Sequence, residues 1–175
     1  RVGALANWAA IQKEADKHKL SVQVMQASNV FSVAGSLGIN CHGWDHNLGT
    51  LSQTVKKITY MNSSGVVRTI SPKDTMFQYI VGGLGLSGVI LAVEIELADN
   101  LLLKELAIEI PIEEYAEYFD KNVFKNNKIS MSLYRLSLEQ GKLLEKGFLQ
   151  TYEIVDNKPR VSQHLNFEPE NGEWL

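Results

Sequence analysis

The stretch "GGLGLSGVILAVEIEL" at residues 82–97 constrains the fold most, because it puts four glycines directly before a strongly patterned segment. Gly83, Gly85 and Gly88 have the spacing G-x-G-x-x-G, and Glu109 follows about twenty residues later, as in a dinucleotide-binding Rossmann turn. That turn needs a strand before the glycines and a helix after them. Here the segment that follows alternates with period two and is rich in β-branched residues, which favours a strand. An NAD-dependent Rossmann enzyme therefore remains possible only if this segment is helical.

The glycines still need a physical reason, and two remain open. They could let the backbone approach a flat or phosphorylated ligand, or they could allow a helix to pack tightly on the sheet.

The rest of the chain predicts short strands and a few helices. Asn7 can cap an amphipathic helix, and Asn62–Gly65 suits a hairpin turn closed by a glycine at positive φ. The character of the sequence shifts near residue 100, where we expect a domain boundary. We expect strands at 2–5, 21–25, 55–61, 66–70, 89–97, 101–110, 129–138 and 147–155. We expect helices after Asn7, after Pro72 and at 112–124. In the last of these helices, Tyr115, Phe119 and Val123 would lie on the buried side.

Residues 26–50 behave differently, with four glycines, two histidines and little periodicity. Their apolar side chains favour a packed functional loop over a floppy surface excursion. His42 and His46 could be metal ligands, but the glycine-rich context argues against a helix that would put them on one face. We expect no metal site here, and we expect Cys41 to be a small packed residue rather than a nucleophile.

Composition excludes several classes of function. The net charge is −3 without a basic run, which argues against nucleic acid as a partner, and no apolar run is long enough for a membrane span. A single cysteine allows no disulfide within the chain and suits a reducing, cytoplasmic compartment. The opening "RVGAL" reads like a strand entered in the middle, so we expect a fragment of a longer protein.

One combination of motifs carries a family resemblance. The loop "SVAGSLGINCHG", the hairpin "TVKKITYMNSSGVVRTIS" and the run "MFQYIVGGLGLSGVI" follow one another in this order. Together they resemble the FAD-binding domain of the vanillyl-alcohol-oxidase family, also called the PCMH-type or FAD-linked-oxidase fold. The similarity is closest to the branch that oxidises sugars and polyols, which includes aldonolactone oxidases, alditol oxidase and decaprenylphosphoryl-ribose oxidase.

The resemblance implies an α+β fold in two parts. Residues 1–99 would be the second half of a FAD-binding PCMH-type domain of α/β type with a mixed sheet. Residues 100–175 would begin an α+β substrate (cap) domain, with a tail that is disordered from about residue 156. The family's first subdomain, with its glycine-rich phosphate loop, has no match in this chain.

The resemblance also implies which residues bind FAD. One group would lie beside the pyrophosphate and ring system, a second near the flavin, and a third at the adenosine end. These groups are Ser32, Ala34, Gly35 and Ser36; Asn40, Cys41, His42 and Gly43; and Gly88 and Ile90. Ser32 stands where some relatives have a cysteine linked to the flavin, so no thioether is carried over. The family's catalytic base comes from later in the cap domain, and no catalytic residue is assigned here.

The activity implied is that of a FAD-dependent oxidoreductase, which oxidises a C–OH group of a sugar-like, aldonolactone or polyol substrate by hydride transfer to the flavin. The expected partners are FAD and this small molecule. The alternative is a binding or scaffold domain that keeps the fold without bound flavin.

Overall fold

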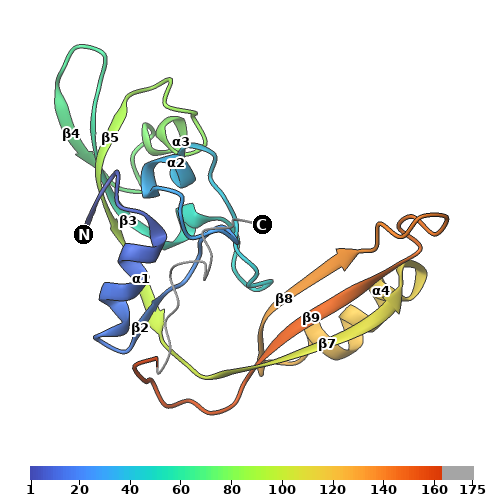
Figure 1. The fold of residues 1–175 in the computed structure, drawn as a ribbon. Helices are drawn as coiled ribbons and strands as arrows, with labels where there is room; N and C mark the ends of the chain where they lie inside the picture. The colour runs from blue at the N-terminus through green and yellow to red at the C-terminus, as the bar shows by residue number, and fades with distance from the viewer. Residues whose placement is uncertain (163–175) are drawn as a thin grey trace, which may run out of the picture. The chain divides into compact units, whose positions relative to one another are not determined.

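The structure is a computed structural model that describes residues 1–162, and the chain divides into two compact units (Figure 1). The first unit contains Arg1–Gly43 and Thr50–Asn100, and residues 159–162 belong to it as well. The second unit contains Leu101–Lys158 together with the short segment Trp44–Gly49.

A four-stranded sheet organises the first unit, in the order β1-β5-β3-β4. These strands are β1 (Val2–Gly3), β5 (Val89–Ile95), β3 (Val55–Met61) and β4 (Val67–Ile70). The interior strand β5 pairs Val93 with Ile58 of β3, and both side chains are buried. The strand predicted after the glycines is thus confirmed, which excludes the Rossmann interpretation. Directly after it, β6 (Leu97–Asp99) pairs with β2 (Leu20–Val22).

The α+β class is confirmed, but the prediction of a mixed sheet is wrong for the part of the chain that the structure describes. Every recorded strand pair is antiparallel. The physical reason is the position of β5. The strands β1 and β3 run in the same direction, but β5 lies between them and is antiparallel to both.

Helix α1 (Trp8–Asp16) follows β1 and begins as the sequence predicts. The Asn7 Oδ1 atom accepts a hydrogen bond from the Ala10 amide at 2.8 Å, which satisfies one of the unpaired donors of the first turn. Trp8, Ile11 and Ala15 are buried on one face of this helix. The amphipathic spacing therefore predicted both the helix and the side that packs.

The β3–β4 hairpin turns at Asn62–Gly65 as expected. The Gly65 amide donates to the Asn62 carbonyl at 3.0 Å, and Gly65 has a φ of +76°. The Asn62 side chain accepts from the amides of Ser64 and Val66, which fixes the turn. The short helix α3 (Phe77–Ile80) follows, with Phe77 and Ile80 buried.

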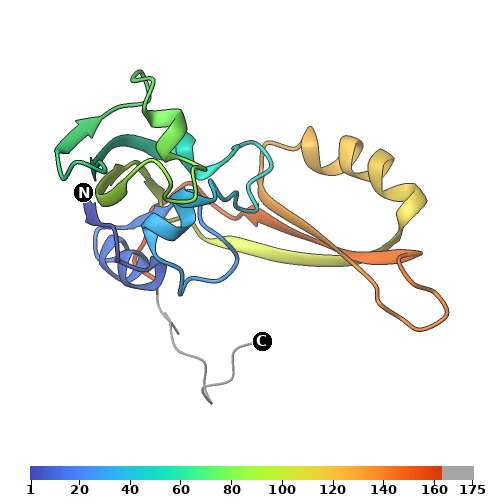
Figure 2. The same ribbon diagram turned by 90° about the horizontal axis from the view of Figure 1, so that it is seen from above.

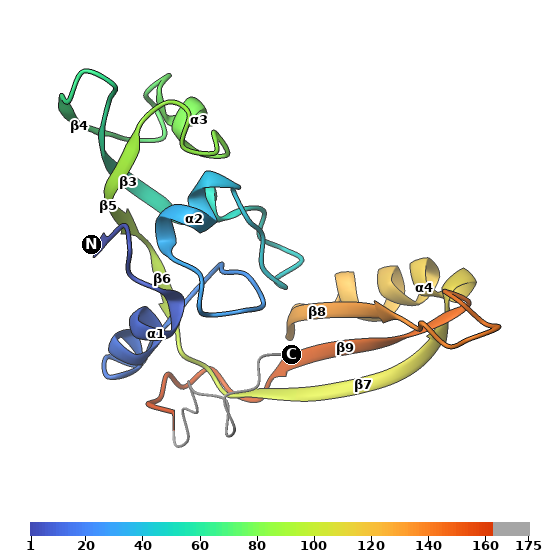
Figure 3. The same ribbon diagram turned by 45° about the horizontal axis from the view of Figure 1, so that its top comes forward.

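A three-stranded antiparallel sheet forms the second unit, in the order β7-β9-β8. These strands are β7 (Leu103–Pro111), β9 (Lys146–Ile154) and β8 (Ile129–Leu136). Helix α4 (Ile112–Phe119) continues into the π-helix η2 (Asp120–Phe124) and covers one face of this sheet (Figure 2, Figure 3). Tyr115, Phe119 and Val123 pack in its core, so the predicted buried side of the helix is confirmed.

The segment 26–50 contains more regular structure than its composition predicts. It holds helix α2 (Val33–Gly38), and the 3-10 helix η1 (Leu51–Thr54) follows it. The tail expected from about residue 156 falls mainly on residues 163–175, which lie outside the described part. Before them, Ser162 donates its amide to Asp16 at 2.8 Å. No helix among the described residues is long and apolar enough to cross a membrane.

Candidate functional site

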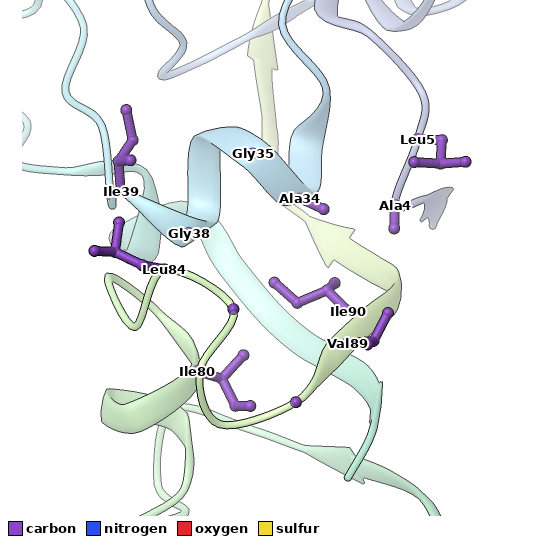
Figure 4. A pocket seen from close by; sticks show the side chains of 12 residues that line it. Ala4, Leu5, Ala34, Gly35, Gly38, Ile39, Ile80, Leu84, Val89 and Ile90 are labelled. Atoms are coloured by element: carbon purple, nitrogen blue, oxygen red, sulfur yellow. The ribbon is translucent and has the colours of Figure 1, made fainter. Parts of the chain in front are cut away.

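A cavity of about 470 Å³ opens in the first unit (Figure 4). Its walls come from helix α2, from the turn after α3, from the start of β5 and from residues 4 and 5. None of its twelve lining side chains carries a nitrogen, oxygen or sulfur atom. The side-chain surface of this cavity therefore suits a flat apolar group better than a charged one.

The first turn of α2 forms one wall, and its amides are already bonded. The Val33 and Ala34 amides donate to the carbonyls of Ala6 and Ala4 at 2.9 and 3.0 Å. The Gly35 amide donates to the Ser32 hydroxyl at 3.2 Å, which caps the helix. This turn consequently offers no spare backbone donor for an anion. What it offers a ligand is a backbone with small side chains, which a flat group can approach closely.

The opposite wall is the glycine turn that follows α3. The amides of Gly82 and Leu84 donate to the carbonyls of Leu37 and Gly38 at 2.8 and 2.9 Å. These two bonds fasten the turn to the end of α2, where the Gly38 carbonyl would otherwise lack an intrahelical partner and the Leu37 carbonyl also accepts from the Asn40 amide. Leu84 and Gly85 both have positive φ, +52° and +79°, so the turn reverses within two residues.

Close packing inside the first unit explains two of the motif glycines. A Cβ atom on Gly83 would lie 2.0 Å from the Tyr79 carbonyl oxygen. A Cβ atom on Gly88, where φ is +148°, would lie 2.7 Å from the Met61 carbonyl oxygen and 2.8 Å from the Tyr60 ring. Neighbouring protein atoms therefore require glycine at both positions, with or without a ligand. At Gly83 these atoms belong to the preceding helix α3 and at Gly88 to strand β3, so neither contact is a helix packing on the sheet.

Four of the ten residues predicted to bind the cofactor line this cavity: Ala34, Gly35, Gly88 and Ile90. Ser32 caps α2 beside it. Ser36 is fully buried and is hydrogen-bonded inside the unit, with its hydroxyl accepting from the Trp8 indole at 2.8 Å.

The other four predicted residues follow α2 and do not line the cavity. Asn40 has a φ of +48°, and its side chain accepts from the Ser52 amide at 3.2 Å. Cys41 is buried, and desolvation raises the pKa of its thiol, so the thiol stays protonated at neutral pH. His42 is exposed, with its Nδ1 atom 2.9 Å from the Gly43 carbonyl.

Sequence reasoning missed most of the apolar rim. Leu5 and Leu84 line the cavity with 90% and 71% of their surfaces exposed. Ile39 and Val89 are exposed there as well. Gly85 was visible as part of the glycine motif, but nothing in the sequence distinguishes the apolar residues of the rim from core residues, because only the fold shows which remain uncovered.

The two histidines of segment 26–50 fall in different units of the chain. His42 belongs to the first unit and His46 to the second. His46 packs edge-on against Phe119, and its Nδ1 atom lies 3.3 Å from the Ser132 hydroxyl. Within residues 1–162 no group of three or more histidine, cysteine, aspartate or glutamate side chains could hold a metal ion.

Comparison with curated proteins finds two oxidases, while no protein-family model matches the chain. The chain is 32% identical over 91 residues to decaprenylphosphoryl-β-D-ribose oxidase of Mycolicibacterium smegmatis, which covers 50% of this chain and 20% of that protein. It is 29% identical over 113 residues to alditol oxidase of a Streptomyces species, covering 64% of this chain and 27% of that protein. The matches thus span about a fifth to a quarter of the relatives.

Comparison with solved structures finds the same fold in the His121Ala mutant of cholesterol oxidase from Brevibacterium sterolicum. The TM-score is 0.67 at 19% identity, over 90% of this chain and 32% of that one. Both curated relatives are enzymes of the branch that the motifs pointed to. The family resemblance read from the sequence is therefore confirmed.

Proposed function

We propose that this chain, a relative of the FAD-linked oxidases of the vanillyl-alcohol-oxidase family, is part of the FAD-binding machinery of an oxidoreductase. The observation that carries the proposal is the apolar cavity against α2, the glycine turn and β5. Residues from the loop and strand of the family pattern meet there, although they are more than fifty positions apart in the chain.

The cavity fits a flat ring of FAD rather than its pyrophosphate. Its lining side chains are hydrocarbon, and the amides of the first turn of α2 already have partners. Gly38 has no side chain to project into the cavity, and the nearest atom to a Cβ atom placed there is the Leu84 Cα, at 4.0 Å. Ala34, Gly35, Gly88 and Ile90 would contact the flavin ring, so Gly88 and Ile90, which the resemblance put at the adenosine end, are reassigned to the ring in this proposal. The phosphates would be held by groups outside this cavity.

The remaining candidate residues have supporting positions in this proposal. Ser32 and Ser36 hold α2 in place, while Asn40, Cys41, His42 and Gly43 shape the chain that leaves it. Bound FAD would supply the acceptor for a hydride. The residues described here exclude water from the ring and orient it, and none of them is assigned as a catalytic acid or base.

We assign residues 1–99 to the FAD-binding domain and residues 100–175 to the start of a substrate domain. The substrate of the whole protein would be a small molecule with a C–OH group, of the sugar-like, aldonolactone or polyol class, as the names of the curated relatives suggest. We place the protein in the cytoplasm, without nucleic acid as a partner.

A visible absorption spectrum tests the proposal. The longest natural form of the protein should copurify with flavin and absorb near about 450 nm. Residues 1–175 alone should bind FAD weakly, with no sub-micromolar affinity in a fluorescence titration, because an incomplete site still bears the entropy of ordering the ligand. If the long form carries no flavin and takes none up, the alternative of a flavin-free scaffold domain replaces the enzyme.

A further inference from the structure

A buried hydrogen-bond network lies behind the wall of the cavity. The Trp8 indole Nε1 donates to the Ser36 hydroxyl at 2.8 Å and to the Gln26 Oε1 atom at 3.1 Å. The Ser36 hydroxyl lies 2.5 Å from the same Gln26 oxygen and 2.9 Å from the Ser32 carbonyl, so it can donate to either. Helix α1 and two parts of the segment 26–50 thus share one set of polar contacts.

These contacts are costly to lose because the groups are removed from water. Trp8 and Ser36 are both completely buried. A buried indole N–H without an acceptor loses its hydration without compensation. Among the described residues, Ser36 and Gln26 are the recorded acceptors of this N–H group. The position of Trp8 relative to α2 is therefore fixed by the hydrogen bonds of its indole N–H as well as by packing.

The network acts on the helix that forms the cavity wall. Ser36 lies in α2 between Gly35 and Gly38, both of which line the cavity. Its side chain is turned inward, since it is buried, whereas Gly35 is exposed. A shift of α2 by even part of an ångström would move the backbone that has to approach the ring.

We propose that Trp8 and Gln26, acting through Ser36, are positioning residues that set the distance between α2 and the cofactor ring. This inference rests on the proposed function and goes beyond it, since it assigns roles to two residues outside the cavity. It also gives Ser36 a role other than ligand contact.

Two substitutions remove one side of the network each. In the longest natural form, Trp8→Phe removes the indole N–H, and Ser36→Ala removes the hydroxyl. Each should raise the FAD dissociation constant about three- to tenfold and shift the flavin absorption band. The double variant should show less than the product of the two single effects, because both changes break the same interaction.

A matched control separates positioning from general destabilisation. Thr54 is also buried and donates its hydroxyl to the Leu51 carbonyl at 2.9 Å, away from the cavity. Thr54→Val should lower the melting temperature with no change in FAD affinity or spectrum. Gln26→Glu keeps an acceptor oxygen and should retain more affinity than Gln26→Leu. Equal effects of Ser36→Ala and Thr54→Val on FAD affinity would overturn the proposal.

Hydrogen exchange without flavin keeps the two proposals distinguishable. Trp8→Phe and Ser36→Ala should speed the exchange of the Ile39 and Asn40 amides, which are bonded to α2 carbonyls, more than Thr54→Val does. If the wild type binds no flavin, the proposed function fails, but faster exchange here still supports positioning of α2. Unchanged exchange in both variants overturns the positioning role, whatever the protein binds.

Discussion

Two stretches within segment 26–50 both contain glycine and lack periodicity, but they have different structural roles. Val33–Gly38 forms α2 and lines a cavity in the first unit, whereas Trp44–Gly49 belongs to the second unit. The difference teaches that the partners of each stretch, rather than its own composition, decide its conformation.

The partners of α2 are backbone groups of the first unit. A helix of six residues is too short to be stable alone. Here the Val33 and Ala34 amides donate to residues 6 and 4, and the Trp8 and Ala9 amides donate to Phe31 and Asn29 in return. The first-turn amides of each helix therefore donate to carbonyls of the chain that leads into the other helix.

The partners of Trp44–Gly49 belong to the second sheet. The Ser132 amide of β8 donates to the Trp44 carbonyl at 2.9 Å. Trp44 stacks on Tyr152 with ring centroids 5.9 Å apart, and His46 packs against Phe119. Phe119 packs on the face of the sheet that α4 covers, as does Leu149 of β9. Tyr152 lies three positions after Leu149 in the same strand, so its side chain is on the opposite face. Trp44–Gly49 therefore contacts both faces of the sheet at its β8 edge.

The largest expected effect on stability and flavin content comes from a substitution in the wall of the cavity. Gly88→Val should destabilise the first unit by about 4 kcal/mol or more, because the new side chain meets Met61 and the Tyr60 ring at a positive φ. The flavin-to-protein ratio of the long form should fall far below that of Cys41→Ser, which changes little volume. Circular dichroism shows which variants fold. If Cys41→Ser loses its flavin while Gly88→Val keeps it, the loop is misaligned.

Hydrogen exchange sharpens the comparison directly. Without flavin, amides of residues 26–50 should exchange at least about a hundredfold faster than those of residues 89–97, which lie in and beside an interior strand. Within the segment, Val33 and Ala34 should be slower than Trp44–Gly49. Equal protection of the segment and the strand would contradict the assignment of this segment to the cofactor site.

Trp44→Ala should destabilise the second unit by about 2 kcal/mol, because it removes the ring that stacks on Tyr152. Exchange should accelerate around Ser132 and Tyr152 and stay unchanged in α2. Trp44→Phe, which keeps an aromatic ring, serves as the matched control and should lose less. Faster exchange in α2 instead would show that the segment supports the first unit.

Gly38→Ala should give the smallest effect and separate stability from binding. A methyl group there meets only ordinary contact with Leu84, and alanine favours a helix by up to about 1 kcal/mol over glycine. The melting temperature should hold or rise, while FAD affinity falls about threefold because the methyl narrows the cavity. Unchanged affinity in a titration of the long form would exclude Gly38 from ring contact.

The sequence by itself determined the elements that depend on local rules. Alternation of apolar residues predicted β5, helical spacing predicted α1 and its buried face, and Asn62–Gly65 predicted its turn. These features are decided within a few residues, by side-chain periodicity, capping and the conformational freedom of glycine. The motif order likewise argued against the Rossmann fold, and the observed strand β5 then excluded it.

Only the tertiary structure decided α2, the cavity and the reason for the glycines. Helix α2 forms because the carbonyls of residues 4 and 6 and the side chain of Trp8 reach it from another part of the chain. Gly88 is required by the carbonyl oxygen of Met61 and the ring of Tyr60, which lie on a neighbouring strand, whereas Gly83 is required by the carbonyl of Tyr79 only four positions earlier. The contacts of α2 and of Gly88 join residues distant along the chain, and whether a leucine stays exposed or enters a core depends on what the fold places over it.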